Sequence, residues 1–259
     1  MGAHRRDFLK IAGLGVLGLA AKPELSAQED GQGHSTPPVP GKALTAERWA
    51  MVVDLNKCRE EKGCTDCIAA CHKEHNVPDF GNPKDEIKWI WKDEFHTVFH
   101  DLAGDHVRED LEHTPTLLLC NHCANPPCVR VCPTQATWKR EKDGIVMMDW
   151  HRCIGCRYCV VACPYGSRSF NWRDPRPALS EINPDFPTRT RGVVEKCTFC
   201  EHRLAKGELP ACVEACPVDA LTFGDLEDAT SKVRHLLAEN FTIRRRPALG
   251  TQPQVYYIV

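Results

Sequence analysis

The sequence lacks an excess of either charge and is poor in aromatic side chains. Of its 259 residues, 33 are Lys or Arg and 35 are Asp or Glu, which gives a formal net charge of −2. Binding to nucleic acid usually requires a concentrated positive field, so this balance argues against that function. Apolar residues reach 42 % but aromatic residues only 7 %. This composition indicates a globular protein that draws part of its stability from something other than a large core.

The N-terminal segment also lacks an apolar run long enough to span a bilayer. The stretch Ile11–Ala21 has eleven residues, whereas a spanning helix needs about 20. Just before it, Arg5-Arg6-Asp7-Phe8-Leu9-Lys10 resembles a twin-arginine export signal, and Leu25-Ser26-Ala27 suits a cleavage site. We therefore expect residues 1–27 to be a signal peptide and the mature protein to lie in the periplasm. Residues 28–47, rich in Gly, Pro and polar groups, are expected to form a linker.

Cysteine, by contrast, is abundant. The chain contains 16 cysteines, and each belongs to a group of four that ends in C-x3-C. The groups are Cys58, Cys64, Cys67, Cys71; Cys120, Cys123, Cys128, Cys132; Cys153, Cys156, Cys159, Cys163; and Cys197, Cys200, Cys212, Cys216. No cysteine is left over.

The spacing of the third group, C-x2-C-x2-C-x3-C-P, is that of bacterial ferredoxins. Three closely spaced cysteines can wrap one iron–sulfur cubane, while the fourth, followed by Pro164, points to a neighbouring cluster. The second and fourth groups lengthen one spacing, and the last two cysteines of the fourth are expected on a helix after the loop Leu204–Pro210. The first group, C-x5-C-x2-C-x3-C, departs most: it has three extra residues after Cys58, and His72 replaces the usual proline.

Other uses of cysteine fit these spacings poorly. Structural zinc needs two pairs far enough apart to close a tetrahedron, adjacent C-x2-C runs seldom serve as disulfide frameworks, and the C-x-x-C-H motif of covalent haem is absent. The spacings favour iron–sulfur clusters, and a structural zinc scaffold is the alternative from another class. Metal analysis distinguishes them, because four cubanes hold about sixteen iron atoms and a scaffold about four zinc ions. Twin-arginine export suits such cargo, because clusters are assembled in the cytoplasm and must cross the membrane in a folded protein.

With four ferredoxin-type groups, the chain resembles the electron-transfer subunits of the dimethyl sulfoxide reductase type from about Trp49 to Val259. The resemblance includes the run from Gly192 to Cys200 and the ending from Leu249 to Tyr257. In that family the first and fourth groups share two clusters, and the second and third share two more. It implies four [4Fe–4S] clusters with these ligands: Cys58, Cys64, Cys67 and Cys216; Cys71, Cys197, Cys200 and Cys212; Cys120, Cys123, Cys128 and Cys163; and Cys132, Cys153, Cys156 and Cys159.

Two further stretches, Asp174–Pro177 and Ile182–Thr190, are similar to the DsrO branch of this family, the exported subunit of a membrane complex linked to sulfur metabolism. The branch implies an integral membrane quinone-reactive partner and a multihaem cytochrome c. The alternative is that the protein is the electron-transfer subunit of a molybdopterin reductase or nitrite reductase system. Since no transmembrane segment follows the signal, we expect attachment to the outer face of the cytoplasmic membrane only through partners.

The expected fold is α+β, with short hairpins, short helices and long loops. Trp49–Asp54 is predicted to be a short buried strand. Asp143-Gly144 lies between two apolar runs and predicts a hairpin with a type I′-like turn. The family resemblance implies two pseudo-symmetric ferredoxin-like modules, each binding two clusters. The module of groups two and three, residues 119–173, would be inserted in that of groups one and four, residues 48–118 and 174–259.

The remaining residues predict no catalytic site, because no nucleophile with a base and an orienting partner is evident. We therefore expect an electron relay and not an enzyme. Apolar residues beside the ligands are expected to shield the clusters from water, namely Val129, Val131, Ile154, Val160 and Val161. The stretch His72–His113 carries six histidines among acidic residues, which predicts a solvated insertion; a metal or haem site is the alternative. They are His72, His75, His96, His100, His106 and His113.

Overall fold

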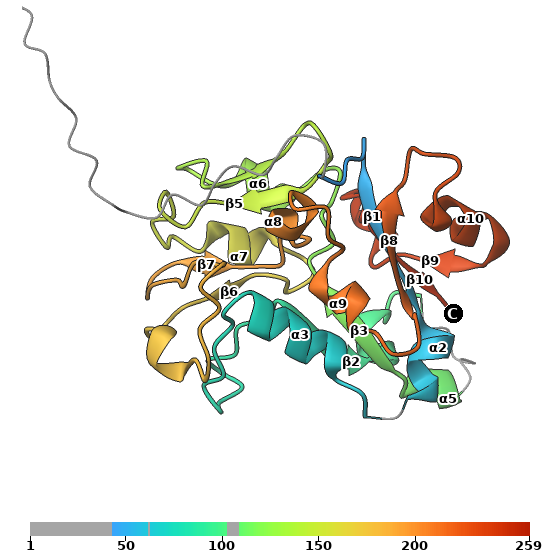
Figure 1. Cartoon of the computed structure of the whole chain (residues 1–259), viewed down its shortest axis with the longest axis horizontal. Coiled ribbons are helices and arrows are strands. Elements are labelled where there is room, and N and C mark those ends of the chain that lie inside the picture. Colours follow the sequence, from blue (N-terminus) through green and yellow to red (C-terminus); the bar gives the residue numbers. More distant parts are fainter. Residues whose placement is uncertain (1–42, 62, 103–108) are drawn as a thin grey trace, which may run out of the picture. The chain divides into compact units, whose positions relative to one another are not determined.

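A computed structural model describes residues 43–259, apart from residue 62 and residues 103–108. The predicted export signal (1–27), most of the predicted linker (28–47) and His106 lie outside the described residues. Within them, short helices and strands alternate with long loops, as expected for an α+β protein (Figure 1). The division into two pseudo-symmetric modules stays a prediction. No helix in the described ranges has the length and apolar character needed to cross a membrane.

The largest sheet has four strands in the order β8-β1-β10-β9 (Figure 1). Its strands are β1 (Trp49–Asp54), β8 (Leu221–Asp225), β9 (Thr242–Ile243) and β10 (Val255–Ile258). The predicted strand Trp49–Asp54 is confirmed, and it pairs in parallel with β10 and antiparallel with β8. Alternate residues of a strand face opposite sides of the sheet, so Met51 and Val53 join the main core while Ala50 and Val52 pack against helix α10 (Lys232–Glu239).

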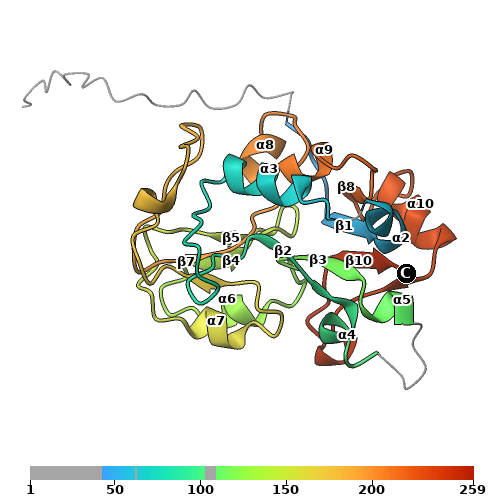
Figure 2. The same cartoon turned by 90° about the horizontal axis from the view of Figure 1, so that it is seen from below.

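A second pair of strands, β2 (Ile90–Glu94) and β3 (Pro115–Leu119), forms an antiparallel hairpin in which Ile90 lies opposite Leu119. The connection carries two short helices, α4 (Phe95–Val98) and α5 (Glu109–Glu112). The two strands lie side by side (Figure 2). Most of their residues belong to the main core, whereas Glu94 and Pro115, at the end where the connection joins the strands, are exposed.

The predicted hairpin around Asp143-Gly144 is confirmed as β4 (Thr137–Lys139) and β5 (Val146–Met148). The turn differs from the prediction. A type I′ turn needs positive φ at both central residues, and only Gly144 of this pair has it. The Asp143 carboxylate instead accepts hydrogen bonds from the Arg140 guanidinium and the Ile145 amide, which stabilises a longer loop closed between Arg140 N and Ile145 O.

The remaining elements are short and carry or flank the cysteines. Strands β6 (Ser169–Phe170) and β7 (Val194–Glu195) pair antiparallel. The helices are α2 (Leu55–Glu60), α3 (Asp66–Glu74), α6 (Pro127–Arg130), α7 (Tyr158–Ala162), α8 (Glu201–Leu204) and α9 (Ala211–Glu214), with 3-10 turns at Arg176–Ala178 and Pro247–Leu249. Helix α3 packs against α9, and α6 against α7. Elements far apart in the sequence are thereby brought together around the thiols.

Candidate metal centres

All sixteen cysteines lie in the described part of the chain, and none forms a disulfide. They gather in sets that combine cysteines from different groups of the sequence. We number the sets by the order in which they neighbour one another. Their members are, for set I, Cys58, Cys64, Cys67 and Cys216; for set II, Cys71, Cys197, Cys200 and Cys212; for set III, Cys120, Cys123, Cys128 and Cys163; and for set IV, Cys132, Cys153 and Cys159, to which the family resemblance adds Cys156.

The four cysteines of set I line one small pocket with apolar walls that include Leu117 and Leu221. Burial raises the pKa of Cys67 to about 11, and the nearby Lys92 ammonium opposes this shift. Lys92 comes from β2 and donates a hydrogen bond to the carbonyl oxygen of Cys64. A pocket with four thiols and a cation beside it suits a metal cluster, because the thiolates that ligate such a cluster give it negative charge.

Set II is the most deeply buried. Cys71 and Cys212 come from the packed helices α3 and α9, and Cys197 and Cys200 from the turn before α8. Burial raises the pKa of Cys71 well above its ordinary value, and the Cys200, Cys212 and Cys197 thiols, which are its electrostatic neighbours, raise it further. All four members are buried.

Set III lines a small pocket between the end of β3, α6 and the end of α7. Burial raises the pKa of Cys123 to about 12. The buried Arg168 donates from Nη2 to Cys128 Sγ at 3.1 Å and to Thr137 Oγ1 at 2.8 Å. Hydrogen bonds to the sulfurs of a cluster, like its net charge, help to set its potential.

Set IV is the least enclosed. Cys132 and Cys153 pack beside the buried Cys159 in a small apolar cluster, and the Cys153 thiol raises the pKa of Cys159 after the larger effect of burial. Cys156 lies between Gly155 and Arg157, both of which have positive φ. The pKa of Cys132 is lowered, because hydrogen bonds from Thr137 and Thr134 outweigh its partial burial.

The four sets follow one another as a series of neighbours. Cys67 of set I is an electrostatic neighbour of Cys71 and Cys212 in set II. Burial raises the pKa of Cys197 to about 12, and Cys120 of set III is the next largest cause. Set III adjoins set IV, because Cys128 is an electrostatic neighbour of Cys159. Three of the four thiols in set I and in set IV are partly exposed, whereas the inner sets are almost wholly buried.

Thiols at these positions fit [4Fe–4S] clusters better than the other groups weighed from the sequence. The pockets of sets I and III each present four sulfurs that form no disulfide and have mostly apolar walls, which is the environment that shields such a cluster from water. Thiols whose pKa is raised by burial, such as Cys67, Cys71 and Cys123, are neutral without metal, so binding of iron must release their protons. When bound, a [4Fe–4S] cluster takes up or gives up one electron at a time.

His75 is placed differently from the sequence-based expectation. Its ring is 1 % exposed and stacks on Trp89 with centroids 4.4 Å apart. Nδ1 lies 2.8 Å from the carbonyl oxygen of Cys71, and Nε2 lies 3.4 Å from Cys200 Sγ. Burial lowers its pKa to about 3, so the imidazole is neutral. The expected solvated insertion is therefore wrong for His75, which follows the last turn of α3 and faces set II.

A buried ion pair beneath His75 was not predicted from the sequence. Arg189 and Glu195 pair at 2.6 Å with both side chains fully buried. Glu195 also accepts hydrogen bonds from Trp89 Nε1 and Asn171 Nδ2, and Arg189 donates to the carbonyl oxygen of His75. This network fixes the Trp89 ring against which His75 stacks. Arg189 lies in the stretch Ile182–Thr190, but the sequence offers no sign that its charge is buried.

The expected apolar shield is only partly present. Val129 and Val160 pack on the small core beside sets III and IV. Val161 and Ile154, however, are 87 % and 66 % exposed, and Val131 is also exposed. Helix α7 turns Val160 inward and its neighbour Val161 outward, because successive residues point about 100° apart around a helix. The prediction is therefore wrong for Ile154, Val131 and Val161.

Comparisons with known proteins agree with these centres. Two domain profiles, both described as a 4Fe-4S dicluster domain, match residues 111–177 and 152–220. The chain is 42 % identical to the Hdr-like menaquinol oxidoreductase iron–sulfur subunit 1 of Archaeoglobus fulgidus, over 98 % of this chain and 97 % of that protein. It is 42 % identical to a putative dimethyl sulfoxide reductase iron–sulfur subunit of Halobacterium salinarum, over 81 % and 78 %. It is 38 % identical to the menaquinone reductase iron–sulfur cluster-binding subunit of Nitratidesulfovibrio vulgaris, over 82 % and 88 %.

Similarity along almost the full length of both proteins, together with two dicluster matches, goes beyond a shared motif. The matched domains are 4Fe-4S domains, which disfavours the zinc alternative. The chain belongs to the family of 4Fe-4S iron–sulfur subunits of menaquinol and dimethyl sulfoxide reductase-type systems, and it binds four [4Fe–4S] clusters.

Proposed function

We propose that this protein is an exported electron-transfer subunit that relays single electrons between a quinone-reactive membrane subunit and a second redox partner. In this proposal each of sets I to IV ligates one [4Fe–4S] cluster. The observation that carries it is the arrangement of the sets: they neighbour one another in series, and only the first and last reach the surface through several thiols. Such an order suits entry of electrons at one end and exit at the other.

The chain's own residues serve the relay by holding the thiols and setting their surroundings. Short helices and tight turns fix the cysteines, and apolar walls exclude water from the inner sets. Lys92 and Arg168 add positive charge beside sets I and III. Positive charge near a cluster stabilises its reduced form and raises its potential. The relay performs no bond chemistry, and substrate conversion belongs to partner subunits.

The proposed partners follow from the relatives and from the branch similarity. Relatives named as menaquinol oxidoreductase and menaquinone reductase subunits support a quinone-reactive membrane partner. The stretches Asp174–Pro177 and Ile182–Thr190 support the DsrO type, with a multihaem cytochrome c as the second partner. A molybdopterin or nitrite reductase is the alternative partner, and the relative named for dimethyl sulfoxide reductase favours the molybdopterin enzyme. In the purified native complex, covalent haem indicates a cytochrome partner, and molybdenum indicates a molybdopterin partner. Mass spectrometry of the subunits shows whether the partner is a nitrite reductase.

Purification of the native complex under anaerobic conditions tests the relay. We expect a menaquinol analogue to reduce the clusters, or a menaquinone analogue to reoxidise clusters that dithionite has reduced, as followed by electron paramagnetic resonance (EPR). The Cys156→Ser variant, altered in set IV, should interrupt electron transfer between the two partners, because it breaks one end of the series, while the clusters of sets I to III still respond to dithionite. If neither quinone analogue changes clusters that respond to dithionite, the proposed function is wrong.

Export is tested separately, in cells. The double variant Arg5→Lys, Arg6→Lys is expected to leave the protein in the cytoplasm, because the paired arginines are the feature that the twin-arginine pathway reads. Lys22→Gln, which removes a charge from the same segment but keeps the pair, is the matched control and should be exported. Equal periplasmic amounts of the double variant and the control would contradict periplasmic export by this route.

A further inference from the structure

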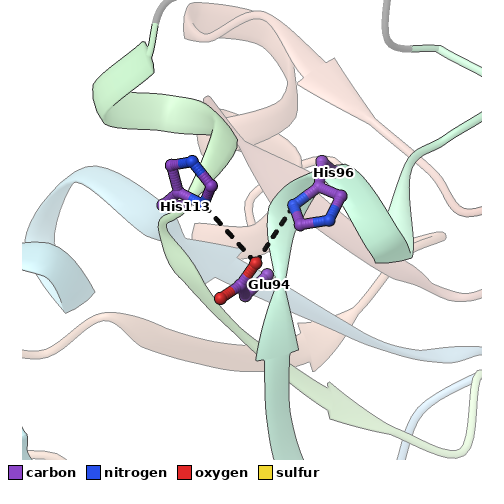
Figure 3. A group of neighbouring side chains, drawn as sticks. All are labelled: Glu94, His96 and His113. Atoms are coloured by element: carbon purple, nitrogen blue, oxygen red, sulfur yellow. Dashed lines mark hydrogen bonds and ion pairs between the residues drawn. The ribbon is translucent and has the colours of Figure 1, made fainter.

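Three side chains with metal-binding groups meet at the connected end of the β2–β3 hairpin, where α4 and α5 join the two strands, and none belongs to the cysteine sets. Glu94 is the last residue of β2, His96 lies in α4, and His113 precedes β3 by two residues. The backbone holds them there: Glu94 lies opposite Pro115 in the strand pair, and Phe95 N donates to Thr114 O at 3.0 Å. In Figure 3 the two imidazoles flank the Glu94 carboxylate and point to the same oxygen.

The distances among these groups match those of ligands around a transition ion. Glu94 Oε2 lies 3.2 Å from His96 Nδ1 and 3.4 Å from His113 Nδ1. A tetrahedral zinc ion with bonds of about 2.0–2.1 Å spaces its ligand atoms about 3.3–3.4 Å apart. All three ligand atoms lie within 4.8 Å of one another, so a small rotation of an imidazole completes a three-ligand face.

The surroundings favour a cation and help to orient one ligand. His96 Nε2 lies 3.3 Å from Thr97 Oγ1, a contact that can hold the ring with Nδ1 toward Glu94. The same Nδ1 lies 3.3 Å from Glu112 O, so without an ion it can donate a hydrogen bond there; with Nδ1 on an ion, the ring would carry its proton on Nε2, which faces Thr97 Oγ1. Helix α5, which ends just before His113, carries three acidic residues and adds negative potential.

We propose that Glu94, His96 and His113 form a binding site for a divalent transition ion of the zinc class, separate from the [4Fe–4S] clusters. Two imidazoles and one carboxylate suit zinc, copper or nickel better than magnesium or calcium, which prefer oxygen ligands. Three protein ligands leave one tetrahedral position for water or for a side chain of another protein. The side chains are 54 %, 41 % and 63 % exposed, in that residue order, so the ion exchanges with solvent.

Equilibrium dialysis of the cluster-loaded protein against zinc alone tests the site. We expect one zinc per chain while the iron content stays at about sixteen per chain, which shows that zinc has not replaced iron at the cysteines. His113→Ala and Glu94→Gln should each weaken zinc binding at least tenfold. His100→Ala is the matched control: it removes a nearby exposed histidine whose ring contacts only Thr97 O among the contacts described, and it should bind zinc as the unaltered chain does.

Competition with magnesium tests the class of ion. An excess of magnesium should not displace the zinc, because the donor set contains two nitrogens. The proposal is overturned if the cluster-loaded protein takes up no zinc, if His113→Ala and Glu94→Gln bind zinc as tightly as His100→Ala, or if magnesium competes on equal terms. Iron content is measured in the same samples, so a variant that fails to assemble its clusters is recognised at once. If one of the two variants, Glu94→Gln or His113→Ala, loses iron, the comparison of zinc affinity uses the other variant.

Discussion

At the scale of single residues, Arg168 is the clearest link between a side chain and a cluster property. It is 4 % exposed and donates to Cys128 Sγ at 3.1 Å. Burial disfavours its charge, but the sulfurs of Cys128 and Cys159, which are negative when they ligate iron, more than compensate and raise the pKa of Arg168. A buried cation that donates to a ligand sulfur stabilises the more negative, reduced cluster, and such a bond contributes about 1.5–3 kcal/mol.

Replacing Arg168 should therefore lower the potential of the cluster in set III. We expect Arg168→Met to shift its midpoint downward by about 60 mV or more, the equivalent of roughly 1.4 kcal/mol for one electron. The measurement is an EPR-monitored redox titration of the cluster-loaded protein. Arg152→Met, which removes a mostly exposed arginine paired with Asp149, serves as the control. An unchanged midpoint at full iron content would show that Arg168 has only a packing role.

The pair of Arg189 and Glu195 gives a second prediction at this scale. In Glu195→Gln the Arg189 charge stays buried without its partner, a loss that usually costs about 3–5 kcal/mol. We expect guanidinium to release the clusters at a clearly lower concentration than in the unaltered chain, as followed by visible absorbance. Asp174→Asn breaks an exposed pair with Arg176 and should leave this midpoint unchanged. Equal midpoints for the two variants would rule out an energetic role for the buried pair.

At the scale of elements, the loop from Cys153 to Cys159 depends on a glycine. Gly155 has φ of +68°, and a Cβ atom there would lie 2.3 Å from Gly192 O. Gly155→Ala should therefore distort the loop and lower the iron content from about sixteen to about twelve per chain. Gly166→Ala is matched in φ, at +65°, but a Cβ there meets nothing within 4 Å, so it should keep all its iron. Full iron in Gly155→Ala would contradict this.

Elements with local signals could be predicted from the sequence, and those set by distant contacts could not. The strand Trp49–Asp54 and the hairpin around Gly144 follow from apolar runs and a turn residue, so both were predicted correctly. The turn type was not, because the Asp143 side chain bonds to Arg140 and Ile145 instead of allowing a tight two-residue turn. The residues next to Asp143 in the sequence do not indicate that its carboxylate will accept these hydrogen bonds.

The metal centres divide in the same way. The spacing within each cysteine group is local and predicts iron–sulfur ligands, but which groups share a set depends on contacts between distant segments, and only the family resemblance supplied it. His75 was missed because its acidic and polar neighbours suggested exposure. One signal was available: His75 follows Cys71 by four residues, the spacing that places two residues on the same side of a helix. For Arg189 no comparable signal exists.

At the scale of the whole molecule, the clusters and the protein core are one structure. Five of the buried cysteines, from sets I, II and III, are part of the main hydrophobic core. The helices around them have four to nine residues, and isolated helices of that length are not stable in water. The cysteine-bearing segments are therefore held by tertiary contacts and by what the thiols bind, more than by their own secondary structure.

Removing the clusters should consequently unfold most of the described chain. Treatment with a chelator under anaerobic, reducing conditions leaves sixteen thiols, many of them buried and neutral because burial raises their pKa values. In that state they no longer join the helices to one another, and metal-binding free energy is lost from folding. We expect the near-ultraviolet circular dichroism to collapse and limited proteolysis to become rapid, and both to recover when iron and sulfide are restored. A compact, protease-resistant chain without iron would mean that the apolar core folds on its own.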